Sequence, residues 1–178
     1  MRPTLMAFAL ALSIPNSQAS PVDLWNLLGK GDTALPGGDV VYSLKNPAGV
    51  SVNVGVNFGE LVDGGFASLE LTAFKFNSNF TPEELQLFAS NVIQISAACF
   101  NTDLSRGPAI TAWMLSNDAR EESIYYTAGA RIARKSFGPL QLALGKRLNG
   151  KGHAVTVSLS RKGIPGQAPW IKSCLTSG

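Results

Sequence analysis

The clearest hydrophobic pattern in the chain lies between residues 81 and 99, where apolar and polar positions follow the period of an α-helix. Thr81, Pro82 and Glu84 at its start are typical of an N-cap, a first helical position and the last residue of a Thr-x-x-Glu capping box. The pattern predicts one central amphipathic helix whose apolar stripe packs against a sheet. Five residues at spacings of three and four form the stripe: Leu85, Phe88, Val92, Ile95 and Cys99.

Before this helix, three stretches alternate apolar and polar residues with the period of two that is typical of strands, at 39–45, 51–58 and 66–76. The first two are separated by Asn46-Pro47-Ala48-Gly49, which has the residue preferences of a type I turn. These strands are therefore expected to form a hairpin that leads into a third strand. A short docking helix is expected earlier, over residues 21–28.

After the helix, residues 108–120 fit a second short helix, although Ala112 to Leu115 would also fit a strand. The last third of the chain predicts a three-stranded meander over 123–135, 140–148 and 153–161, with turns at 136–139 and 149–152. The fold class expected is α+β, in which an antiparallel sheet made of two groups of about three strands packs against the central helix.

The first 19 residues have the pattern of an export signal. Arg2 is followed by an apolar run over 5–14 and by Ser17-Gln18-Ala19, a small-x-small cleavage site. The run of about ten apolar residues is shorter than the roughly 20 that a membrane-spanning helix needs. The sequence therefore predicts an exported protein, whether periplasmic, cell-envelope or extracellular, with a single domain over 20–178.

Two cysteines, Cys99 and Cys174, are present. In an oxidising compartment this even number favours a disulfide, which would tie the carboxy-terminal tail to the end of the central helix. The chain-entropy model gives such a bond roughly 4 kcal/mol of stabilisation. Two buried free thiols are the alternative. The spacing of the cysteines and the single histidine, His153, matches no zinc pattern, so neither a metal nor a cofactor is expected.

Charge is distributed unevenly along the chain. All 12 acidic residues lie at or before Glu122, whereas residues 123–178 contain nine Lys or Arg and no Asp or Glu. This asymmetry suggests an anionic partner, such as nucleic acid, an acidic polysaccharide, an anionic membrane surface or the acidic face of another protein. Mutual neutralisation of the two halves in the folded protein is the alternative.

The predicted meander brings some of these basic residues together. If Leu148 pairs with His153, Pro139 lies opposite Lys162, and the preceding turn places Lys135 beside Pro139. A solvated strand edge, on which Lys and Arg prevent aggregation, is the alternative interpretation. The ligand-binding cluster expected at this end of the sheet consists of Arg134, Lys135, Arg161 and Lys162.

Catalytic motifs are scarce. The sequence has no Gly-x-Ser-x-Gly elbow, His-Glu-x-x-His motif, calcium loop or dinucleotide-binding glycine pattern. The leading hypothesis is a non-enzymatic exported binding protein whose basic cluster contacts an anionic partner. The alternatives are a structural subunit of a cell-envelope assembly and a small hydrolase that uses paired carboxylates. Five acidic residues are candidates for such a pair: Asp63, Glu70, Asp103, Glu121 and Glu122.

Overall fold

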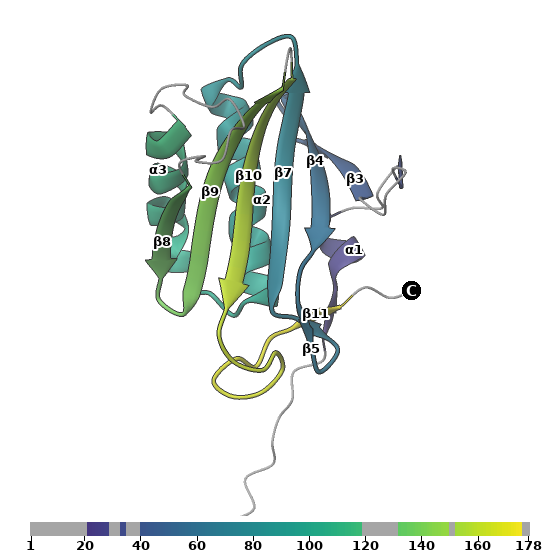
Figure 1. The fold of residues 1–178 in the computed structure, drawn as a ribbon, viewed down its shortest axis with the longest axis vertical. Coiled ribbons are helices and arrows are strands. Elements are labelled where there is room, and N and C mark those ends of the chain that lie inside the picture. Colours follow the sequence, from purple (N-terminus) through teal and green to yellow (C-terminus); the bar gives the residue numbers. More distant parts are fainter. Residues whose placement is uncertain (1–20, 29–32, 35–39, 119–131, 150–151, 176–178) are drawn as a thin grey trace, which may run out of the picture.

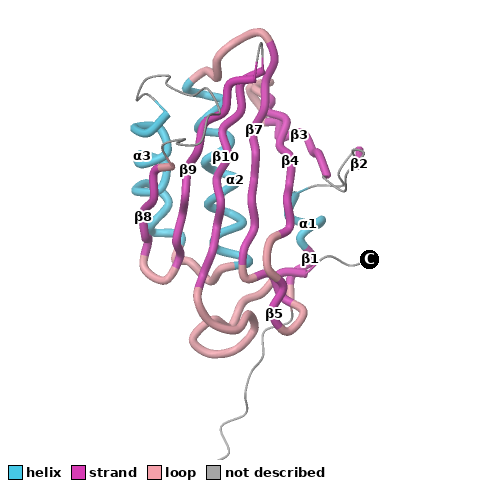
Figure 2. The backbone as a smooth tube through the Cα atoms, viewed as in Figure 1, coloured by secondary structure: helices cyan, strands magenta, loops and turns pink. Residues whose placement is uncertain are grey.

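The computed structural model of the protein describes residues 21–28, 33–34, 40–118, 132–149 and 152–175. Their main feature is a seven-stranded antiparallel sheet with helices on one face (Figures 1 and 2), so the expected α+β class is confirmed. From one edge to the other, the strands are β2 (Thr33–Ala34), β3 (Val40–Lys45), β4 (Ser51–Phe58), β7 (Ser68–Phe76), β10 (Gly152–Arg161), β9 (Leu140–Asn149) and β8 (Ala133–Phe137).

The described part of the chain has three α-helices, and they lie on the same side of the sheet. In Figure 1, α2 (Pro82–Cys99) runs behind the middle strands, α3 (Gly107–Asp118) lies behind β8 and β9, and α1 (Leu24–Leu28) lies near β4. None of the described helices covers the opposite face, which we call the open face (Figure 2). None of them is long and apolar enough to cross a membrane.

Shorter elements gather at the end of the sheet where β10 finishes. A 3₁₀ helix, η1 (Leu104–Arg106), connects α2 with α3. The strand β1 (Val22–Asp23) pairs in parallel with β11 (Cys174–Leu175), and β5 (Leu61–Val62) forms a hairpin with β6 (Gly65–Phe66). Pairing with β11 also explains why α1 begins at Leu24, later than the helix expected over 21–28. The predicted export signal, residues 1–19, lies outside the described residues.

The central helix is confirmed together with its cap. The Thr81 hydroxyl accepts a hydrogen bond from the Glu84 backbone N–H at 3.3 Å, and the Glu84 carboxylate accepts one from the Thr81 N–H at 2.8 Å. Both contacts satisfy N–H groups that have no partner within the helix. All five residues of the predicted stripe are buried.

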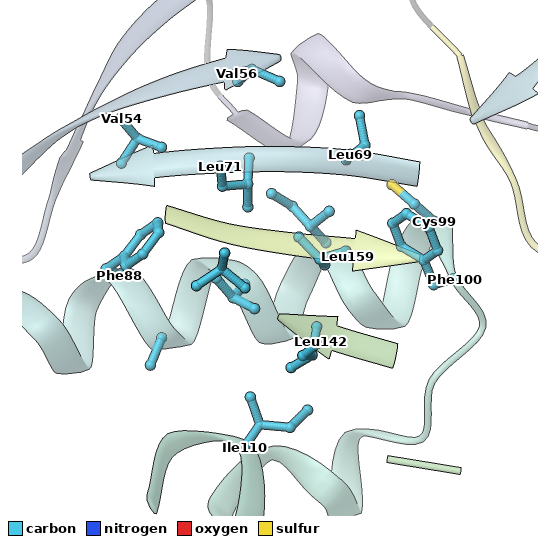
Figure 3. Packing of buried hydrophobic residues seen from close by; sticks show 14 of the residues in the cluster. Val54, Val56, Leu69, Leu71, Phe88, Cys99, Phe100, Ile110, Leu142 and Leu159 are labelled. Carbon is cyan, nitrogen blue, oxygen red and sulfur yellow. The ribbon is translucent and has the colours of Figure 1, made fainter. Parts of the chain in front are cut away.

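The core lies between this stripe and the inward residues of the sheet (Figure 3). Alternation along the strands places every second side chain against the helices, as the sequence pattern predicted. Phe66 differs, because Gly65 and Phe66 pair with β5 and β7 starts only at Ser68. Phe66 is buried and stacks on Phe58, with ring centroids 5.1 Å apart. The period of two over the predicted strand 66–76 would place Phe66 on the same face as Phe74, but Phe66 belongs to β6 and is buried instead.

The second half of the chain agrees with most of the predicted elements. Residues 107–118 form a helix, and His153 pairs with Leu148 as expected. The turn before β9 is shorter than predicted, because β8 continues to Phe137, which pairs with Leu140. Gly138 has a φ of 66°, which glycine adopts without strain and which permits this tight turn. Residues 123–131 of the predicted strand lie outside the described residues.

Two polar contacts join the sheet to α2. The Tyr42 hydroxyl donates to Asn91 Oδ1 at 2.6 Å, and burial raises the pKa of Tyr42. Lys75 Nζ lies 2.8 Å from both carboxylate oxygens of Glu84. Partial burial raises the pKa of Glu84, but hydrogen bonds from Lys75 and from the Thr81 backbone, with the charge of Lys75, bring this pKa below its usual value of 4.5.

The lowered pKa of Glu84 predicts a pH dependence of stability. In the unfolded chain Glu84 binds a proton at a higher pH than in the folded protein, so the stabilisation is complete above pH 4.5 and is lost as the pH falls through the folded pKa. Lys75→Met removes most of this difference. Urea unfolding from pH 7 to pH 3 should show a smaller acid-induced loss of unfolding free energy in Lys75→Met than in the wild type.

The exposed Lys45 provides a matched control for the loss of one positive charge. Lys45→Met should keep the acid dependence of the wild type. Identical profiles for Lys75→Met and the wild type would contradict the role of the Lys75–Glu84 pair.

Candidate functional site

The four basic residues expected to form one cluster are divided between the two faces of the sheet. Arg134 is exposed on β8 and pairs with Ala143, while Lys135 pairs with the buried Leu142. Because neighbouring residues of a strand point to opposite faces, Arg134 lies on the open face and Lys135 on the helix side of the sheet edge. Arg161 lies on the helix-covered face, so the predicted single cluster is wrong.

Arg161 is buried, and backbone carbonyl groups accept hydrogen bonds from its guanidinium. Its Nη1 donates to the Phe100 oxygen at 2.7 Å and its Nη2 donates to the Pro169 oxygen at 3.1 Å. Its central carbon lies 5.3 Å from the centre of the Trp170 ring. Burial lowers the pKa of Arg161, but an arginine remains charged at neutral pH. Arg161 therefore stabilises the end of α2, and the ligand role expected for it is corrected.

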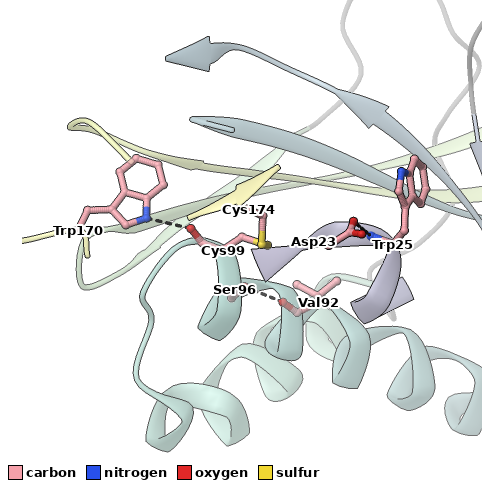
Figure 4. Close-up of a disulfide and its surroundings, with 7 residues drawn as sticks. All are labelled: Asp23, Trp25, Val92, Ser96, Cys99, Trp170 and Cys174. Carbon is pink, nitrogen blue, oxygen red and sulfur yellow. Dashed lines mark hydrogen bonds between the residues drawn. A yellow bond between two sulfur atoms is a disulfide. The ribbon is translucent and has the colours of Figure 1, made fainter. Parts of the chain in front are cut away.

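The predicted disulfide completes this arrangement (Figure 4). Cys99 at the end of α2 is bonded to Cys174 in β11, with Cα atoms 4.8 Å apart. The indole N–H of Trp170 donates to the Cys99 carbonyl at 2.9 Å, and the Trp170 ring stacks on Phe100. The tail expected to pack near the disulfide is thus held by a covalent bond, a hydrogen bond and a ring contact.

Lys135 and Lys162 are both exposed at the periphery of the sheet. The Lys135 ammonium lies 5.3 Å from the centre of the Phe137 ring, and Lys162 directly follows the last residue of β10. A further basic side chain, Arg106, lies against the β8–β9 turn, since its guanidinium carbon would be 3.0 Å from a Cβ added at Gly138. The sequence could not reveal this neighbour, because the two positions are far apart along the chain.

A row of four paired residues crosses the open face, one on each of four strands, and three of them are polar. Arg134 on β8 pairs with Ala143 on β9, which pairs with Ser158 on β10, which pairs with Glu70 on β7. The Ser158 hydroxyl donates to Glu70 Oε2 at 3.1 Å. At about 4.8 Å between strands, the backbones of Arg134 and Glu70 are about 14 Å apart. The small residues between them leave a depression.

This depression is a trough that runs along β9 and β10. Two adjoining hollows, of about 360 and 390 Å³, share Arg134, Ala143 and Ser158 in their linings. Along β10 the trough extends from Ala154 to Ser160, which is about 20 Å at the rise of an extended strand. We call it the open-face trough. The sequence feature that corresponds to the trough is a set of small residues at alternate positions of the last two long strands, on the face that the core residues do not use: Ala143, Gly145, Ala154, Thr156, Ser158 and Ser160.

Two phenylalanines lie beside the trough on the open face of β7. Phe74 pairs with Ala154, which lines the trough, and the ring centroids of Phe74 and Phe76 are 6.4 Å apart. Phe76 is 69% exposed, the largest value among the exposed large apolar side chains of the described residues. The period of two along β7 directs both rings to this face, opposite the buried Ala73.

The carboxylates considered for hydrolysis are distributed over separate elements. Asp63 is in the turn between β5 and β6, Glu70 is on the open face, and Asp103 caps η1 by accepting from the Ser105 N–H at 2.8 Å. Glu121 and Glu122 lie outside the described residues. Within the described part of the chain, no group of three or more His, Cys, Asp or Glu residues is placed to hold a metal ion.

Comparison with protein-family models, curated proteins and solved structures finds no match to this chain. The interpretation of the open-face trough therefore depends on its own geometry and chemistry.

Two adjacent residues test the structural role of Arg161. Arg161→Met leaves the Phe100 and Pro169 carbonyls without their charged donor, and should lower the free energy of unfolding by roughly 2–4 kcal/mol. Lys162→Met also removes one positive charge, but from an exposed position, and should change the free energy of unfolding by about 0.5 kcal/mol or less. Urea unfolding followed by circular dichroism measures both. Equal destabilisation by the two substitutions would contradict this role.

Proposed function

We propose that the protein is an exported, non-enzymatic binding protein that contacts an anionic partner through the basic side of the open-face trough. The observation that carries the proposal is the position of Arg134. Its side chain is exposed in the wall of the trough and has no hydrogen-bond or ion-pair partner among the described residues. An unpaired guanidinium offers five N–H donors in a geometry that suits carboxylates and phosphates.

Charge on the open face is concentrated at the Arg134 end of the trough. Lys135 and Lys146 also have atoms in the lining, but each pairs with a buried core residue, so alternation directs their side chains to the helix side of the sheet. The backbone of Glu70 is about 14 Å from that of Arg134, so the positive potential that attracts an anion is local to Arg134. The ligand role expected from the sequence is kept for Arg134, and Lys135 and Lys162 remain at the periphery of the sheet.

A salt titration of binding tests the proposed function. Duplex DNA, polygalacturonate and polyglutamate serve as probes for the protein spanning residues 20–178 and for its Arg134→Gln variant. Binding of at least one probe should weaken as salt rises, because bound counterions are released. With duplex DNA, loss of the Arg134 contact should reduce the slope of log K against log salt by about 0.9.

The matched control is Lys45→Gln, which removes one exposed positive charge that does not line the trough. This control should retain most of the affinity and the slope of the wild type. If none of the probes binds at low salt, or if both variants lose affinity equally, the trough does not hold the anionic partner.

A further inference from the structure

The shape of the open-face trough favours a chain over a compact ligand. The trough follows the strands for about 20 Å, and its two hollows join at Arg134, Ala143 and Ser158. Its floor consists of small side chains on two paired strands, so a backbone or a sugar ring can approach the sheet closely. An extended polymer segment would fill both hollows at once, whereas a small ion would occupy only one.

The lining is rich in groups that bind hydroxyls. Ser136, Gln141 and Ser160 line one hollow and make no side-chain hydrogen bond to any described residue. Thr72 and Thr156 line the other, where their hydroxyls lie 3.0 Å apart. Such side chains both donate and accept hydrogen bonds, which matches a ligand that carries many hydroxyl groups.

The charged residues on the two sides of the trough restrict the chemical class of the ligand further. Arg134 on one side can pair with a carboxylate, and Glu70 on the other can accept hydrogen bonds from hydroxyls. A polymer of uronic acids carries free hydroxyls on every ring that can donate to Glu70, whereas the sugars inside a DNA strand carry none. A polymer that combines hydroxyls with carboxylates therefore suits both sides of the trough.

The exposed phenylalanines add a surface for ring stacking. Phe76, 69% exposed, and its neighbour Phe74 lie on the open face next to the end of the trough marked by Ala154. The face of an aromatic ring is electronegative, and the C–H side of a sugar ring is apolar and weakly electropositive. A sugar ring can therefore pack on this pair while its neighbours lie in the trough.

We infer that the open-face trough binds a single chain of an acidic polysaccharide. A uronate carboxylate pairs with Arg134, sugar hydroxyls bind the serine, threonine and glutamate side chains, and one ring stacks on Phe76. The inference rests on the proposed function, because both require Arg134 to contact an anion. It goes further by naming the chemical class of the ligand and by giving Phe76 a role.

Calorimetry with four probes tests the inference: oligogalacturonate, the same oligomer methyl-esterified to remove its charge, polyglutamate and single-stranded DNA. Oligogalacturonate should bind at least about tenfold more tightly than each of the other three, which corresponds to about 1.4 kcal/mol. Phe76→Ala should weaken oligogalacturonate binding by about tenfold, comparable with the loss of one ring stacked on an aromatic side chain. It should leave the salt dependence unchanged, whereas Arg134→Gln should reduce it.

Leu104→Ala is the matched control for Phe76→Ala, because Leu104 is also strongly exposed, at 62%, but lies outside the trough. It should bind like the wild type. If all the anionic probes bind equally and Phe76→Ala has no effect, the polysaccharide inference is overturned while the proposed function stands. If no anionic probe binds, both are overturned.

Discussion

The carbonyl groups at the carboxyl end of α2 need donors, and the structure supplies them from the last third of the chain. Phe100 and Cys99 carry carbonyls that the helix leaves without internal partners. Arg161 from β10 and Trp170 from the tail donate to them, and the Cys99–Cys174 bond fixes the tail in place. Helix, sheet and tail therefore meet at one point, and the orientation of β10 against α2 depends on it.

Strand β10 carries both Arg161, which contacts the end of α2, and part of the candidate site on its opposite face. Arg161 and Leu159 point toward the helices, whereas Ser158 and Ser160 point into the open-face trough. The floor of the trough is thus the reverse side of a strand whose inner face is buried and hydrogen-bonded. Because that floor is anchored, a ligand would meet a surface that is already formed and loses little conformational entropy on binding.

Local patterns in the sequence predicted the elements of the fold, and contacts between distant residues decided the site. The capping box at Thr81, the alternation over 51–58 and the pairing of His153 with Leu148 are local signals, and all three are confirmed. The partners of Arg161 lie up to 61 residues away in the chain. No local pattern shows such partners, so the sequence alone favoured a ligand contact for this basic strand residue. The trough depends on the pairing of β7 with β10, which no local pattern indicates.

The most direct test of this account is to map the bound ligand residue by residue. Amide chemical shifts of ¹⁵N-labelled protein, recorded during titration with oligogalacturonate, report which strands meet the ligand. Binding in the open-face trough should concentrate perturbations at the trough positions of β8, β9 and β10 and at Phe74 and Phe76 on β7, with little change along α2. Perturbations centred on the helices or on the tail around Trp170, or none at any concentration, would contradict it.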